Sequence, residues 1–117
     1  MAAQEIQGED YRVYYDAAAA TVYFKGDLSL SGPAEYEPIV HLLHTVVATD
    51  PATMTLDLRK LGFLNSSGIN MVSKFVLSLR QKPATHLIVL GSHEIAWQGK
   101  SLKNLERLLP GVTLEME

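Results

Sequence analysis

The sequence lacks cysteine altogether in its 117 residues. That absence excludes disulfide bonds, a thiol nucleophile and any metal site built on thiolates, and it fits a reducing cytoplasm. No apolar run approaches the roughly 18 residues that a membrane-spanning helix needs. The N-terminus also lacks the basic and then apolar segments of a secretion signal. From these absences we expect a cytoplasmic protein that is not inserted in a membrane.

A strong excess of charge is also missing. Ten basic and 13 acidic residues leave a formal net charge of −3, so we expect no general affinity for nucleic acid or anionic membranes. A hydrophobic content of 47% with 20% charged residues is ordinary for a globular protein. A chain of this length favours one domain, residues 1–117, that buries roughly two-thirds of its unfolded surface.

Signatures of common enzymes are absent as well. The sequence has no G-x-S-x-G elbow and no G-x-x-x-x-G-K-[ST] loop for a nucleotide. A serine hydrolase also needs a base that is hydrogen-bonded to the nucleophile, and no histidine can be placed beside a serine from the sequence. We therefore expect a binding protein rather than an enzyme, and no cofactor.

One stretch, residues 53–80, organises the rest of the chain. Residues 53–58 alternate polar and apolar side chains, which is typical of a half-buried strand. Arg59-Lys60 and then Gly62 are predicted to end that strand. After Asn65, apolar side chains recur at steps of three and four, as on one face of a helix; they are Ile69, Val72, Phe75, Val76 and Leu79.

The turn between this strand and this helix is Asn65-Ser66-Ser67-Gly68. Asn and Ser are good helix N-caps because a short side-chain oxygen accepts a hydrogen bond from a free N–H of the first turn. Glycine has no Cβ, so another backbone segment can approach it closely. The pattern predicts an exposed serine hydroxyl at the positive end of a helix, where a phosphate would meet unpaired N–H groups. The same residues also serve as ordinary caps and turn formers.

The remaining elements follow from the same two periodicities. Residues 1–10 are polar and are expected to lie outside regular structure, at least to Gln4. Residues 86–90 form a continuous apolar run, typical of a strand covered on both faces. Because Pro38 is tolerated only in a first helical turn, the first helix is expected to begin near residues 34–37 and to end near 48–50. Further strands are predicted at 11–15, 21–25 and 112–116, and a last helix at 100–109.

The resulting order is β-β-α-β-α-β-α-β. Parallel strands need crossover connections, which the helices supply. We predict an α/β fold with one mixed β-sheet and helices packed mainly on one side. The strand at 112–116 is expected at an edge of that sheet.

Two segments resemble a known family. Leu56-Asp57-Leu58 and the stretch F-L-N-S-S-G-I at residues 63–69 resemble the strand and D-S-S-G-[LIV] loop of STAS domains, the fold of bacterial anti-sigma-factor antagonists. The stretch F-K-G-D-L at residues 24–28 resembles the G-[DE]-[LI] end of that family's second strand. The resemblance covers nearly the whole chain in element order and implies a single STAS-like domain.

The resemblance also implies a mechanism called partner switching. In such antagonists, the first serine after the acid is phosphorylated by a partner serine kinase with an ATPase fold, which is also the anti-sigma factor. A PP2C-type phosphatase is a further expected partner. The corresponding residue here is Ser66, with Ser67 as second choice. The unphosphorylated protein would bind its partner and free a sigma factor, and the phosphorylated form would let go.

The resemblance further implies a surface that contacts the partner, and its residues are Asp27, Leu28, Ser29, Asn65, Ser67, Gly68 and Ile69. Asn65 stands where the family usually has an acid, and Ser29 replaces another frequent acid. Asn keeps the capping oxygen but removes a carboxylate that would repel a phosphate and could align the serine in a kinase. Asn65 is therefore interpreted either as a simple cap or as a tuned contact. Residues 27–29 are equally a strand end leading into a helix.

Several other features have two interpretations each. The alternative function is that of a phosphorylation-independent STAS adaptor subunit of a transport or signalling complex, whose binding would be unaffected by Ser66→Asp. His41 and His44, with Glu37 one turn earlier, have a spacing that can hold a metal, but no third ligand is nearby in sequence and we predict none. Trp97 is either a lid over the core or a partner anchor. The basic residues Lys100, Lys103 and Arg107 indicate a solvated helix face more than an anion site.

Overall fold

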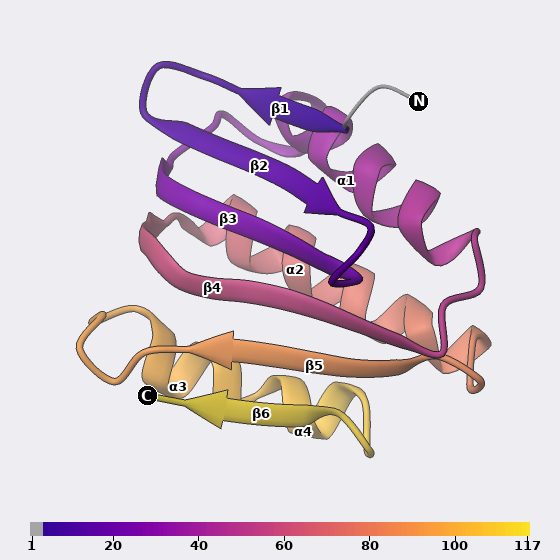
Figure 1. The fold of residues 1–117 in the computed structure, drawn as a ribbon. Helices are drawn as coiled ribbons and strands as arrows, with labels where there is room; N and C mark the ends of the chain where they lie inside the picture. The colour runs from indigo at the N-terminus through magenta and orange to yellow at the C-terminus, as the bar shows by residue number, and fades with distance from the viewer. Residues whose placement is uncertain (1–3) are drawn as a thin grey trace.

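The computed structural model describes residues 4–117 as one six-stranded sheet with its helices on one face (Figure 1). The strands lie in sequence order, with β1, β2 and β3 antiparallel and β3 to β6 parallel. The strands are β1 (Glu5–Gln7), β2 (Tyr11–Asp16), β3 (Thr21–Leu28), β4 (Thr53–Leu64), β5 (His86–Gly91) and β6 (Thr113–Met116). The helices are α1 (Pro33–Val47), α2 (Ser66–Ser78), the 3₁₀ turn η1 (Leu79–Gln81), α3 (Gln98–Lys103) and α4 (Leu105–Leu108).

The predicted fold class is confirmed: the sheet is mixed, and the helices pack on one side of it. The N-terminal segment contains a strand that the sequence pattern did not predict. β1 pairs with β2, where Ile6 lies opposite Val13, and a three-residue strand with one apolar residue is too short to show an alternation. The last predicted helix is divided into α3 and α4 at Asn104. β6 lies at an edge of the sheet, as predicted.

The predicted end of the central strand is wrong. β4 continues through Arg59 and Gly62 to Leu64 because β3 keeps pairing with it. The register shifts twice along this pair, so β4 has an extra residue at each shift, as in a β-bulge. The extension brings the end of β4 beside the end of β3, where Leu28 lies opposite Leu64.

The hydrophobic core lies between the sheet and the helices. Met54, Leu56 and Leu58 of β4 are completely buried on that side, and α1 and α2 cover them with the apolar stripes that the sequence predicted. α1 begins at Pro33, so Pro38 lies inside the helix rather than in its first turn. In β5, Ile88 and Leu90 are only half-buried, so this strand is covered on one face and not on both.

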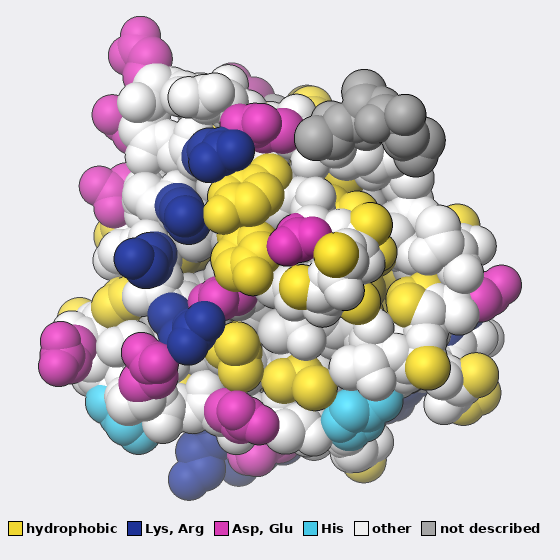
Figure 2. Space-filling view, in the orientation of Figure 1, with side chains coloured by type: hydrophobic (Ala, Val, Ile, Leu, Met, Phe, Trp, Pro, Cys, Tyr) yellow, Lys and Arg dark blue, Asp and Glu magenta, His cyan; other side chains and the backbone are white. Residues whose placement is uncertain are grey.

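No helix formed by residues 4–117 lies over the other face of the sheet (Figure 1). Figure 2 shows a row of Lys and Arg side chains beside hydrophobic ones on this face. The Tyr14 and Tyr23 rings stack at 5.0 Å, and the Arg12 guanidinium lies 4.1 Å from the Tyr14 ring centroid. Asp57 also faces this side, yet its side chain is only 8% exposed because Arg59 covers it.

The pair of Asp57 and Arg59 connects β4 to the last residue of the chain. Arg59 Nη2 donates to Asp57 Oδ2 at 2.7 Å, and Arg59 Nη1 donates to Glu117 Oε2 at 3.0 Å. Burial by itself would raise the pKa of Asp57, but the hydrogen bonds and charge of Arg59, with the charge of Lys25, outweigh it. The pKa of Asp57 is therefore held below its ordinary value.

Asp57→Asn is expected to lower the free energy of unfolding by about 1–3 kcal/mol at pH 7, because hydrogen bonds to a charged group are lost. A carboxylate whose folded pKa is lowered contributes stability that is present above its unfolded pKa of about 3.9 and is lost as the pH falls through the folded pKa. The difference in urea unfolding between Asp57→Asn and wild type should therefore shrink as the pH falls below about 3.9. The exposed Asp10→Asn is the matched control, and a deficit of Asp57→Asn that is independent of pH would contradict this explanation.

Candidate functional site

The candidate site lies where β4 ends and α2 begins, beside the C-terminal end of the neighbouring strand β3 (Figure 1). α2 begins at Ser66, as the sequence predicted. Asn65 is the N-cap, with an extended backbone (φ −78°, ψ 177°), and its Oδ1 accepts a hydrogen bond from the Gly68 N–H at 2.9 Å. The cap fixes the direction in which the two serines leave the sheet.

Asn65 does more than cap the helix. Its Oδ1 also accepts from Tyr36 Oη at 2.6 Å, and its Nδ2 donates to the carbonyl of Leu30 at 2.8 Å. The Asn65 side chain therefore joins α1, the loop after β3 and the first turn of α2. An aspartate could accept the first two bonds but could not donate to Leu30. All three hydrogen bonds lie within the chain, so the structure shows Asn65 as a helix cap and a junction, and its tuned contact with a partner or phosphate stays a prediction.

Tyr36 is the buried partner of this junction. Its side chain is 1% exposed, and besides Asn65 its hydroxyl lies 3.4 Å from the Leu28 carbonyl and from the Leu30 N–H. Burial raises the pKa of Tyr36, so the hydroxyl stays protonated and can donate. Gly68 is needed beside it, because a Cβ at that position would lie only 2.7 Å from Tyr36 Oη.

The two serines differ in their surroundings. Ser66 is exposed, and its hydroxyl makes no hydrogen bond to any residue of 4–117. Ser67 is half-buried and faces a groove between α1 and α2. The Ser66 and Ser67 N–H groups belong to the first turn, where a helix offers no acceptor of its own. The geometry therefore favours Ser66 over Ser67 as the residue that another molecule can reach.

The remaining residues of the predicted partner surface divide into two groups. Asp27 and Ser29 are exposed, and Ile69 is half-buried. Leu28, by contrast, is 0% exposed, and Gly68 is also buried. Leu28 points into the core because it is on the same face of β3 as Phe24, opposite the buried Leu64. Leu28 and Gly68 therefore do not contribute to an exposed surface.

Sequence reasoning missed one residue of this region. Phe63 is 47% exposed, a large value for so apolar a side chain, and it lies opposite Asp27 in the sheet. With β4 predicted to stop before it, Phe63 had no face assigned. No local periodicity reports its exposure, because the alternation breaks between the buried Leu61 and Leu64, where the pairing of β3 with β4 shifts in register.

The other candidate residues were the histidines of α1, Trp97 and the basic residues of α3 and α4. Among residues 4–117, no three His, Asp or Glu side chains come together as a metal site would require. His44 lies edge-on to the Phe75 ring at 5.4 Å. Trp97 is half-buried against the core, and its Nε1 donates to the Leu61 carbonyl at 2.8 Å, which supports the lid interpretation. The three basic residues of α3 and α4 are exposed.

None of the helices formed by residues 4–117 is long and apolar enough to cross a membrane. No protein-family model matches the sequence, and no curated protein matches it significantly. Structural comparison, by contrast, finds clear similarity over nearly the whole chain.

SiaC of Pseudomonas aeruginosa superposes with a TM-score of 0.73 at 17% identity, over 100% of this chain and 98% of that one. A chain in the crystal structure of the P. aeruginosa diguanylate cyclase SiaD in complex with its activator SiaC gives 0.71 at 15% identity, with 96% of both chains covered. An anti-sigma factor antagonist from Mycobacterium paratuberculosis gives 0.59 at 16% identity, over 97% of this chain and 84% of that one. The chain therefore has the STAS fold, as its serine loop and strand order predicted.

Proposed function

We propose that this chain is a regulatory STAS protein that binds another protein through the surface around Ser66, at the C-terminal ends of β3 and β4. We further propose that phosphorylation of Ser66 releases that partner. The observation that carries the proposal is the position of Ser66, exposed at the first residue of α2 with an unengaged hydroxyl. We call the surrounding exposed and half-buried residues the serine surface; they are Asp27, Ser29, Phe63, Asn65, Ser66, Ser67 and Ile69. The protein acts by binding and not by catalysis.

A phosphate on Ser66 would be tolerated by the free protein. It adds about −1.5 to −2 charges at the end of α2 where the helix dipole is positive and the first N–H groups are available. A partner that covers the serine surface would remove water from that charge without supplying a matching cation. The modified form would therefore dissociate, and the fold would not need to change.

The proposed partner is a serine kinase of the anti-sigma-factor type, with an ATPase fold, and a PP2C-type phosphatase would reverse the modification. Support comes from the fold shared with an anti-sigma factor antagonist and from the serine loop that resembles that family's phosphorylated loop. The output would then be control of transcription through a sigma factor, in the cytoplasm.

A second candidate follows from the similarity to SiaC, which is an activator found in complex with a diguanylate cyclase. A chain with this fold can therefore regulate an enzyme by direct binding. In that case the serine surface of this chain would contact a signalling enzyme, and binding would not depend on Ser66 phosphorylation. Dependence of binding on the phosphate separates the two candidates.

Phe63→Ala is expected to weaken binding of the partner about tenfold or more, because an exposed aromatic at the centre of a surface is the typical anchor of an interface. The partner would be captured from the native cells on immobilised wild-type protein, identified by mass spectrometry, and titrated by calorimetry. Leu77→Ala is the matched control, since Leu77 is similarly exposed at 42% but lies near the far end of α2. Equal affinities of wild type and Phe63→Ala for the partner would exclude the serine surface as the contact.

A further inference from the structure

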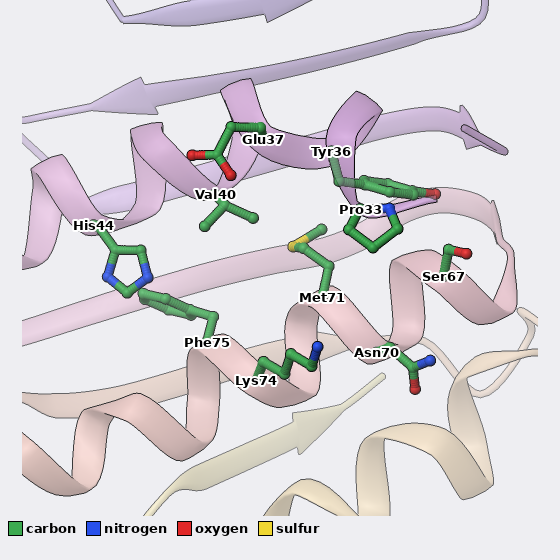
Figure 3. A pocket seen from close by; sticks show the side chains of 10 residues that line it. All are labelled: Pro33, Tyr36, Glu37, Val40, His44, Ser67, Asn70, Met71, Lys74 and Phe75. Atoms are coloured by element: carbon green, nitrogen blue, oxygen red, sulfur yellow. The ribbon is translucent and has the colours of Figure 1, made fainter. Parts of the chain in front are cut away.

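α1 and α2 leave a groove between them on the helical side of the molecule, with a volume of about 390 Å³. Figure 3 shows Val40 of α1 and Met71 of α2 pointing toward one another across its middle. His44 and Phe75 close one end, and Tyr36 lies at the other. A volume in the range of ligand pockets, over an apolar floor, provides room for several side chains of another molecule.

The two sides of the groove carry opposite charges. Glu37 on α1 and Lys74 on α2 are both exposed, and Figure 3 shows them on the two sides of the apolar floor. Neither forms an ion pair with any residue of 4–117. An occupant between them therefore meets an anion along one flank and a cation along the other.

This charge arrangement selects among possible occupants. A purely apolar ligand would leave Glu37 and Lys74 unpaired, and a small anion bound to Lys74 would leave Glu37 unpaired. A helix with an apolar stripe, a basic residue on one flank and an acidic residue on the other would satisfy both groups and the floor. Met71 adds an adaptable surface, because methionine side chains repack readily around different partners.

We infer that this groove is a docking site for an amphipathic helix of a partner protein. The floor extends from Tyr36 to His44, eight residues of α1, which at 1.5 Å per residue is about 12 Å or two helical turns. Apolar side chains at i, i+4 and i+7 of a bound helix extend over about 10 Å and match that length. The inference stands independently of Ser66 phosphorylation, because the groove needs no modified residue.

The probe is a displayed library of 18-residue helical peptides in which the apolar positions i, i+4 and i+7 and the flanking positions are varied. The best binder is expected to combine apolar anchors with an acid on one flank and a base on the other. It should shift the methyl NMR signals of Val40 and Met71. Lys74→Glu is expected to weaken that peptide about tenfold, because attraction becomes repulsion, and replacing the peptide's acid with lysine should restore the affinity.

Lys103→Glu changes another exposed lysine that lies outside the groove and should leave peptide affinity within about twofold. Ser66→Ala should also leave it unchanged, so failure of this inference is distinct from failure of the proposed function. The inference is overturned if no helical peptide is recovered, or if the peptide shifts signals elsewhere. It is also overturned if Lys103→Glu weakens binding as much as Lys74→Glu. Self-association of the chain that Lys74→Glu abolishes in sedimentation would assign the groove to a second copy and overturn the partner helix.

Discussion

Phosphoserine installed at position 66 is expected to weaken binding of the protein partner by about 30- to several-thousand-fold. The charge would be buried at the interface without a matching cation, which costs on the order of 2–5 kcal/mol. Genetic incorporation of phosphoserine gives a homogeneous sample, and calorimetric titration against the captured partner measures the loss. Circular dichroism should be unchanged, since the modified residue lies on the surface at the start of α2.

Two matched forms make this result specific. Ser66→Ala removes the hydroxyl without adding charge and should bind within about threefold of wild type, because a surface hydroxyl contributes little. The form with phosphoserine at position 101, which lies in α3 and is not part of the serine surface, should bind equally well. If the form with phosphoserine at position 66 binds like wild type, regulation by phosphorylation is wrong and the adaptor or activator function is favoured.

Asn65→Ala is expected to lower the free energy of unfolding by about 2–4 kcal/mol. The loss combines the N-cap of α2, about 0.5–2 kcal/mol, with the buried hydroxyl of Tyr36, whose 2.6 Å bond to Asn65 disappears and whose incomplete pairing costs about 1–3 kcal/mol. The loop after β3 also loses the hydrogen bond that Asn65 Nδ2 donates to the Leu30 carbonyl. Urea unfolding followed by circular dichroism gives the difference directly.

Asn65→Asp separates the hydrogen bonds that the Asn65 side chain accepts from the one that it donates. The carboxylate can still accept from Gly68 and Tyr36 but cannot donate to Leu30, so a smaller loss of about 0.5–1.5 kcal/mol is expected. Asn70→Ala, at an exposed position of the same helix, should change stability by no more than about 0.5 kcal/mol. Equal losses for Asn65→Ala and Asn70→Ala would show that the junction contributes no special stability.

Local signals predicted much of the fold. The polar and apolar alternation of residues 53–58 gave the central strand and its buried face, and the cap at Asn65 gave the start of α2 within one residue. Both signals act over a few neighbouring residues, so a single sequence contains them fully. The exposed position of Ser66 was predicted for the same reason, because it directly follows the Asn65 cap.

Features that depend on the pairing of distant segments were not predictable in this way. The register shifts between β3 and β4 prolong β4 to Leu64, and only that extension shows that Phe63 is exposed. Leu28 was expected at the surface because the corresponding loop of the resembling family contacts the partner, whereas here Leu28 lies opposite Leu64 and is buried in the core. The bond between Asn65 and Tyr36 joins residues 29 positions apart, which no local periodicity reports.

Phosphopeptide mapping of the protein isolated from its native cells tests the central claim most directly. Trypsin releases residues 61–74 as one peptide, which contains Ser66, Ser67 and Ser73, and fragment ions distinguish the three serines. We expect a phosphate on Ser66 in the fraction that is free of partner, and none there in the bound fraction. A phosphate confined to another serine, or bound and free fractions that are equally phosphorylated at Ser66, would contradict it.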